Sequence, residues 1–233
     1  MSEAREKVGA RAVEAFVFDM DGLMVDTEPM ARDIWDQVLD HYGFQLDDAT
    51  HRRMVGRRSA DSARIVLEQY PLGVTAEALI VYKNNLWEQK WRQGVPAMPG
   101  LSAVQEALER RGIPWAVATS SPRHYAEHVV QHLGCAALCR AIAAGDEVEH
   151  GKPAPDLYLL AARRLGIAPE RCLALEDSLP GGQAAKAAGM TLVAIPNGTA
   201  TAHDFAFADY IFSSLVEVVT HLDELLAQPD SAT

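Results

Sequence analysis

The sequence predicts an α/β fold: a doubly wound, mostly parallel sheet with a Rossmann-like core, and a second, smaller all-α domain. Short apolar runs rich in β-branched and aromatic residues alternate with segments of helical periodicity. The stretch from about residue 28 to residue 96 breaks this alternation, because it contains helical patterns and no convincing strand. A length of 233 residues and a hydrophobic content of 48% allow one large core and a smaller insert.

The first predicted strand is Ala15 to Phe18, a compact apolar run that ends abruptly at Asp19. Four similar runs follow it, at Trp115 to Ala118, Ala141 to Ala144, Cys172 to Leu175 and Leu192 to Ile195. Helical segments lie between them, at Ser102 to Arg111, Pro122 to Leu133, Pro155 to Leu165 and Gly181 to Ala188. This alternation predicts βαβ units, whose active sites lie beyond the carboxyl ends of the strands.

The predicted helical insert occupies residues 28–96, and residues 1–27 and 97–233 form the α/β domain. The apolar residues of the insert recur at helical spacing in three groups. These are Trp35, Val38, Leu39 and Tyr42; Ile65, Val66, Leu67 and Tyr70; and Leu79, Tyr82, Leu86 and Trp87. The turn-rich segment Gly94 to Gly100 suits the return to the α/β domain. Beyond the last strand run we expect a turn at Asn197-Gly198, an edge strand at Tyr210 to Phe212, a helix from Leu215 to Leu226 and a frayed tail from Gln228.

The charge of the chain limits its partners. It has 21 basic and 32 acidic side chains, a formal net charge of −11, and a pI near 5.1. This negative field repels nucleic acid and anionic membranes, so we expect neither as a partner, and an anionic substrate needs a local cationic site. The sequence has no apolar run of membrane-spanning or signal-peptide length and only three cysteines, Cys135, Cys139 and Cys172. We therefore expect a cytoplasmic protein that is a monomer or a weak homo-oligomer.

Carboxylates follow two of the predicted strands. Asp19 and Asp21 stand at the end of the first, with Gly22 behind them, and the pair Glu176-Asp177 follows another. Carboxylates gathered at neighbouring strand ends repel one another unless a divalent cation neutralises them, and ligation by oxygen alone favours Mg²⁺. The alternative is that aspartate and glycine only form turns here.

Hydroxyl groups and a lysine follow other strands. Thr119, Ser120 and Ser121 lie where a helix begins, and the free N–H groups of a helix N-terminus attract anions. Lys152, one of only five lysines, stands between Gly151 and Pro153 on a loop that restricts it. Together these groups would clamp a phosphate. The alternatives are an ordinary helix cap and a solvated surface lysine.

Four segments in this order resemble the signature motifs of the haloacid dehalogenase superfamily: Asp19 to Glu28, Ala118 to Ser121, Gly151 to Asp156, and Leu175 to Ser178. The likeness spans about residues 16–197. It is to the branch with a helical cap inserted after the first strand, which includes β-phosphoglucomutase, pseudouridine-5′-phosphatase and phosphoglycolate phosphatase. True dehalogenases lack the second aspartate, so Asp21 favours phosphoryl chemistry.

The resemblance implies a role for each matching residue. Asp19 matches the nucleophile that becomes an aspartyl-phosphate, and Asp21 matches the general acid and base. Thr119 and Lys152 match the groups that hold the phosphoryl oxygens, and Ser120 lies beside them in the same motif. Asp177 matches a Mg²⁺ ligand, joined by the Asp19 carboxylate and the Asp21 backbone carbonyl.

The sequence leaves the roles of two sets of residues undecided. Glu176 is either a further metal ligand or a residue that contacts the metal ligands. The insert offers candidates for substrate contacts: the cations Arg57, Arg58 and Lys83, and a stacking face from Trp87 or Trp91. The alternative is that the cations lie on a solvated helix face and that the tryptophans pack in the insert's own core.

The function that we expect is Mg²⁺-dependent hydrolysis of a small phosphomonoester, such as a sugar phosphate. One alternative is a sugar phosphomutase, although Ser59 stands where β-phosphoglucomutase has a phosphate-binding arginine, which leaves only Arg57 or Arg58 to replace it. Another is a binding module without catalysis on the same fold.

Overall fold

The computed structural model describes residues 12–92, 94–197 and 200–227. The predicted tail from Gln228 and Gly198 of the predicted turn lie outside these ranges. Within them, no helix is both long and apolar enough to cross a bilayer.

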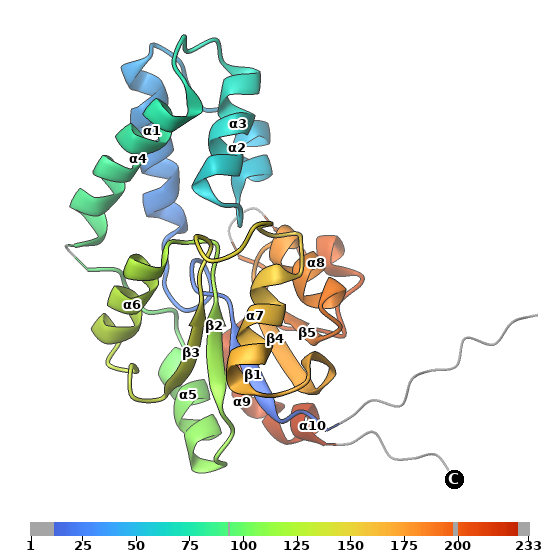
Figure 1. Cartoon of the computed structure of the whole chain (residues 1–233). Coiled ribbons are helices and arrows are strands. Elements are labelled where there is room, and N and C mark those ends of the chain that lie inside the picture. Colours follow the sequence, from blue (N-terminus) through green and yellow to red (C-terminus); the bar gives the residue numbers. More distant parts are fainter. Residues whose placement is uncertain (1–11, 93, 198–199, 228–233) are drawn as a thin grey trace, which may run out of the picture.

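Six parallel strands form one sheet in the order β3-β2-β1-β4-β5-β6. The strands are β1 (Ala15–Phe18), β2 (Trp115–Ala118), β3 (Cys139–Ala143), β4 (Cys172–Glu176), β5 (Thr191–Ala194) and β6 (Tyr210–Ile211). The chain places β1 between β2 and β4, so their carboxyl ends meet at one edge of the sheet (Figure 1). This arrangement confirms the predicted fold class.

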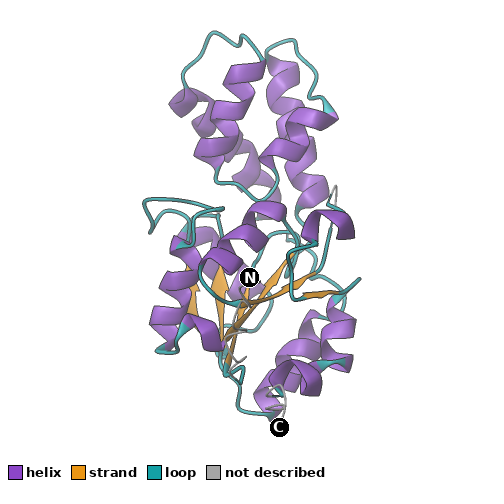
Figure 2. Ribbon diagram, turned by 90° about the vertical axis from the view of Figure 1, so that its right-hand side faces the viewer, coloured by secondary structure: helices purple, strands orange, loops and turns teal. Residues whose placement is uncertain are grey.

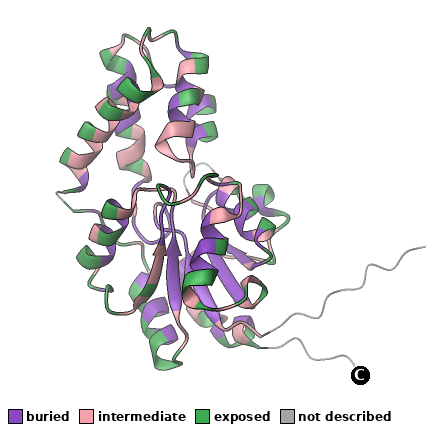
Figure 3. Cartoon of the chain, in the orientation of Figure 1, coloured by how far each residue is buried: buried purple, intermediate pink, exposed green. Residues whose placement is uncertain are grey.

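Helices cover both faces of the sheet because its central strands are apolar on both sides. Phe16 and Phe18 of β1 pack in one cluster, and Ala15 and Val17 pack in another. The first cluster includes α5 (Leu101–Arg110), α6 (Arg123–His132), α9 (Leu215–Thr220) and α10 (Leu222–Leu226). The second includes α7 (Asp156–Leu165) and α8 (Leu179–Ala187). The central strands are buried as a result (Figure 3).

Four helices follow β1 and lie above the carboxyl ends of the strands (Figures 1 and 2). They are α1 (Glu28–His41), α2 (Asp48–Met54), α3 (Ser59–Gln69) and α4 (Ala76–Trp91). These helices share an apolar cluster of their own, which includes Trp35, Leu39, Val66 and Leu79. The helical periodicity of this stretch therefore reflects a separate small core.

The structure corrects the last predicted helix. Residues 215–226 form two helices, α9 and α10, that meet at His221. The His221 backbone departs from helical geometry, with φ −101° and ψ 11°, and its Nδ1 donates to the Glu217 carbonyl oxygen at 2.9 Å. The third strand also begins earlier than predicted, at Cys139. All three cysteines are free thiols.

Candidate functional site

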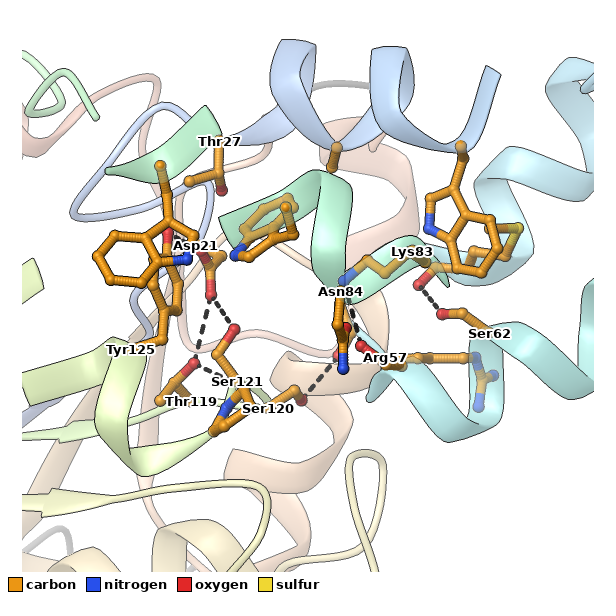
Figure 4. Close-up of a pocket in the computed structure, with 18 of the residues that line it drawn as sticks. Asp21, Thr27, Arg57, Ser62, Lys83, Asn84, Thr119, Ser120, Ser121 and Tyr125 are labelled. Carbon is orange, nitrogen blue, oxygen red and sulfur yellow. Dashed lines mark hydrogen bonds between the residues drawn. The ribbon is translucent and has the colours of Figure 1, made fainter. Parts of the chain in front are cut away.

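A cavity of about 310 Å³ lies between the carboxyl ends of the strands and the helices of the insert. Asp19, Asp21 and Thr119 line it from the α/β side, and Lys83 and Trp87 are among the residues that line it from the insert. Figure 4 shows Asp21, Thr119 and Lys83 around this cavity. A cavity of this size accepts a small metabolite.

Lys152 contacts Asp19 and is almost fully buried, at 2% exposure. Its Nζ lies 2.6 Å from Asp19 Oδ1 and 2.5 Å from Glu176 Oε1. Burial raises the pKa of Asp19 to about 7, and the Lys152 ammonium opposes this rise. Burial lowers the pKa of Lys152, but the negative charges of Asp19 and Glu176 have the larger combined effect and raise it. Lys152 therefore stays charged and holds the Asp19 carboxylate in place.

Both oxygens of Glu176 are occupied by hydrogen bonds. Oε1 accepts from Lys152 and from the Tyr158 hydroxyl at 2.7 Å. Oε2 accepts from the backbone N–H groups of Asp177 and Ser178, and from the Ser178 hydroxyl at 3.0 Å. Of the two roles left open by the sequence, this pattern favours a partner that anchors Lys152 over a direct metal ligand.

Asp177 has the opposite environment. Its Oδ1 is buried and has no hydrogen-bond partner among the residues that the structure describes. Asp19, Glu176 and Asp177 each offer an oxygen within 4.8 Å of the others. Burial, followed by the charges of Asp19 and Glu176, raises the pKa of Asp177 well above its usual range. An unpartnered buried oxygen among carboxylates fits a hard divalent cation such as Mg²⁺.

Gly22 brings the backbone after Asp21 against this carboxylate. It has φ +87°, which favours glycine, and a Cβ there would lie 2.2 Å from Asp177 Oδ2. The backbone of the Asp21 loop therefore approaches Asp177 more closely than any larger residue would allow.

The Asp21 side chain contacts α6 and the loop before it. Its Oδ2 accepts from the Ser121 hydroxyl at 2.7 Å and lies 3.4 Å from the Thr119 hydroxyl, and its Oδ1 accepts from the Tyr125 hydroxyl at 3.3 Å (Figure 4). Burial raises the pKa of Asp21, and the hydroxyl donors oppose the rise. A carboxyl group with a raised pKa suits proton transfer near neutral pH.

The two predicted arginines lie differently. Arg57 lines the cavity, but its Nε donates to the Arg53 carbonyl oxygen at 2.9 Å, so the side chain folds back along the insert, away from Asp21 (Figure 4). Arg58 is not among the residues that line the cavity. Its guanidinium donates to the carbonyl oxygens of Val148 and Glu149 at 3.4 and 3.2 Å, across the boundary between insert and core. The structure thus does not bring Arg58 to the site.

Lys83 is the cation of the insert that lies near the carboxylates. Its Nζ lies 3.2 Å from the Ser59 hydroxyl and 4.6 Å from the centre of the Trp87 ring. Burial lowers the pKa of Lys83 to about 8, and the charge of Asp21 opposes this shift. Ser120 instead donates to the Gly56 carbonyl oxygen at 3.1 Å, so it contacts the insert directly.

Two tyrosines at the site were not predicted from the sequence. Tyr125 and Tyr158 stand on the buried faces of α6 and α7, next to core residues at helical spacing. This pattern is typical of core aromatic residues, and only the folded structure directs their hydroxyls to Asp21 and Glu176.

The chain is similar to several known proteins. A sequence model of the haloacid dehalogenase-like hydrolases matches residues 13–189. Fructose-1-phosphate phosphatase YqaB of Escherichia coli (strain K12) is 38% identical over 177 residues, which are 76% of this chain and 93% of YqaB. The probable pseudouridine-5′-phosphatase of Drosophila melanogaster is 32% identical over 213 residues, 89% of this chain and 92% of that protein. The crystal structure of CbbY from Rhodobacter sphaeroides in complex with phosphate has a TM-score of 0.79 and 30% identity, and the match covers 88% of this chain and 96% of CbbY.

Proposed function

Because this chain belongs to the haloacid dehalogenase-like hydrolase family and is a phosphatase, we propose that it hydrolyses a small phosphomonoester through an aspartyl-phosphate on Asp19, with Mg²⁺. The observation that carries the proposal is the grouping around Asp19, which lines the cavity. The Asp19 carboxylate lies 2.6 Å from the Lys152 ammonium, in a cluster with Asp177, whose Oδ1 has no partner among the described residues.

In the first step, an Asp19 oxygen attacks phosphorus, and the bond from phosphorus to the ester oxygen breaks. Asp21 gives its proton to that oxygen as the alcohol leaves. Lys152 and Thr119 hold the phosphoryl oxygens while charge develops on them. The products of this step are the free alcohol, phospho-Asp19 and an ionised Asp21.

In the second step, water attacks the phosphorus of phospho-Asp19 and gives a proton to Asp21. The bond between phosphorus and Asp19 breaks, which releases inorganic phosphate and restores both side chains. Asp19, Asp177 and the Asp21 backbone carbonyl are the groups that would hold Mg²⁺. When bound, the cation neutralises these carboxylates and the phosphate, so that an anionic nucleophile can approach.

We assign residues 28–96 to a cap domain over a core of residues 1–27 and 97–233. Helices of the insert line the cavity together with the strand ends, which supports a role in choosing substrate and excluding water. The relatives named as fructose-1-phosphate and pseudouridine-5′ phosphatases support a phosphorylated sugar or nucleoside as the substrate class.

The phosphomutase alternative gains no support from the insert. A mutase needs a second cationic site to bind the distal phosphate. β-Phosphoglucomutase has an arginine for this purpose, and Ser59 stands at that position here. Arg57 folds back along the insert and Arg58 bonds to core carbonyl groups. Of the described lysines and arginines of the insert, only Arg57 and Lys83 line the cavity, and Lys83 is the one whose charge acts on Asp21.

A screen of phosphorylated sugars, nucleotides and short acids for phosphate release tests the proposal. We expect turnover that needs Mg²⁺, is lost with a chelator, and falls by several orders of magnitude in Asp19→Asn. Asp40→Asn, an exposed aspartate of α1, serves as the matched control and keeps wild-type activity. Turnover that survives Asp19→Asn would refute the covalent role.

A further inference from the structure

Tyr125 connects the insert to the acid group of the site. The residue is 1% exposed and stands in the first turn of α6, which covers the sheet. Its hydroxyl donates to Asp21 Oδ1 at 3.3 Å, across 104 residues of sequence. Burial raises the pKa of Tyr125, so the hydroxyl keeps its proton and remains a donor.

The ring of Tyr125 contacts two tryptophans of α4. The ring centres of Trp87 and Trp91 lie 5.7 and 5.4 Å away, at angles of 78° and 60° to the Tyr125 ring. Both contacts are edge-to-face, a geometry that fixes ring orientation as well as distance. The position of the Tyr125 hydroxyl therefore depends on where α4 packs.

The two oxygens of Asp21 have different neighbours. Oδ1 faces Tyr125, whereas Oδ2 lies 2.7 Å from the Ser121 hydroxyl and 3.4 Å from the Thr119 hydroxyl. Each oxygen of Asp21 thus accepts from a hydroxyl group, Oδ1 from Tyr125 and Oδ2 from Ser121. The Tyr125 contact holds one edge of the Asp21 carboxyl group and helps to set its orientation in the cavity.

We propose that Tyr125 is a positioning residue that orients the Asp21 carboxyl group toward the leaving oxygen, and that Trp87 and Trp91 make this positioning depend on the insert. The inference rests on the proposed function. In the step concerned, the O–H bond of Asp21 breaks as an O–H bond forms on the leaving oxygen and the ester bond to phosphorus breaks. A leaving group that departs readily as an anion does not need this proton.

The test is the dependence of kcat/KM on the leaving group, measured with Mg²⁺ on phenyl phosphate and p-nitrophenyl phosphate. These substrates have a similar shape, but nitrophenolate leaves without a proton and phenolate does not. We expect Tyr125→Phe, which keeps the ring, to lower kcat/KM about tenfold for phenyl phosphate and less than about twofold for p-nitrophenyl phosphate. Trp87→Leu should give a smaller loss with the same selectivity.

Tyr158→Phe is the matched control, because its hydroxyl bonds to Glu176 and not to Asp21. We expect it to lower kcat/KM for both substrates by the same factor. Equal losses for both substrates in Tyr125→Phe, or none, would overturn the positioning role. Selective loss in Tyr125→Phe but not in Trp87→Leu would overturn the dependence on the insert. A wild-type protein without turnover of either substrate would instead contradict the proposed function itself.

Discussion

Replacing Lys152 by methionine removes the ammonium that neutralises two buried carboxylates. Its Nζ lies 2.6 Å from Asp19 Oδ1 and 2.5 Å from Glu176 Oε1, and all three side chains are at most 7% exposed. Methionine keeps an unbranched apolar stem of similar length, so the substitution mainly removes charge.

The size of the effect follows from these distances. At an effective dielectric of about 20, a pair of unit charges 2.6 Å apart attract by about 6 kcal/mol. The cost of burying the charges offsets much of this attraction, and removing one partner of a buried pair costs about 3–5 kcal/mol. We expect Lys152→Met to lower the free energy of unfolding by about this amount above neutral pH, where Asp19 is ionised, without metal.

The loss should shrink as pH falls. The folded-state pKa of Asp19 is already raised to about 7, and it rises further in the variant, whereas the unfolded value stays at the ordinary 3.8. Both folded proteins bind a proton that the unfolded chain has released, but the variant binds it at a higher pH. The loss therefore shrinks as pH falls from the folded pKa of the variant to that of the wild type, about 7, and changes little below it.

Urea unfolding followed by tryptophan fluorescence, with a chelator present, measures both effects. Lys186→Met is the control, because Lys186 forms a partly exposed pair with Asp209 at 2.7 Å. Such pairs contribute about 0–1 kcal/mol, and we expect a small loss with little dependence on pH. A loss below about 1 kcal/mol for Lys152→Met above neutral pH, or one that does not shrink as pH is lowered toward about 7, would refute the reasoning.

Three further predictions follow from the site. Mg²⁺ should raise the melting temperature of the wild type near neutral pH but not that of Asp177→Asn; equal shifts in both would argue against the site. Gly22→Ala should lose most activity, because its Cβ would lie 2.2 Å from Asp177 Oδ2, whereas Gly43→Ala has a similar φ of +79° and open space, and should keep it; equal losses in a phosphate-release assay would contradict this. Arg58→Ala should lower kcat/KM about fivefold through loss of the bonds between insert and core, and an unchanged value would show that these bonds do not matter.

Local patterns predicted the fold, the family and the residues that meet at the strand ends. The alternation of apolar runs and helical segments was sufficient for the sheet, because burial on both faces makes the strands apolar throughout. The motifs around Asp19, Thr119, Lys152 and Asp177 were visible because each directly follows a strand or precedes a helix. Parallel strands bring such positions to one edge, so their proximity could be expected without coordinates.

Tertiary structure decided which atoms face one another. In the folded chain both oxygens of Glu176 accept hydrogen bonds, whereas Asp177 Oδ1 has no partner among the described residues. Arg58 donates to carbonyl groups of the core. Tertiary structure also directed the Tyr125 hydroxyl, on a helix face typical of core packing, to Asp21. A sequence pattern records whether a side chain is buried. Its hydrogen-bond partner depends on how segments about a hundred residues apart pack, and no local spacing specifies that.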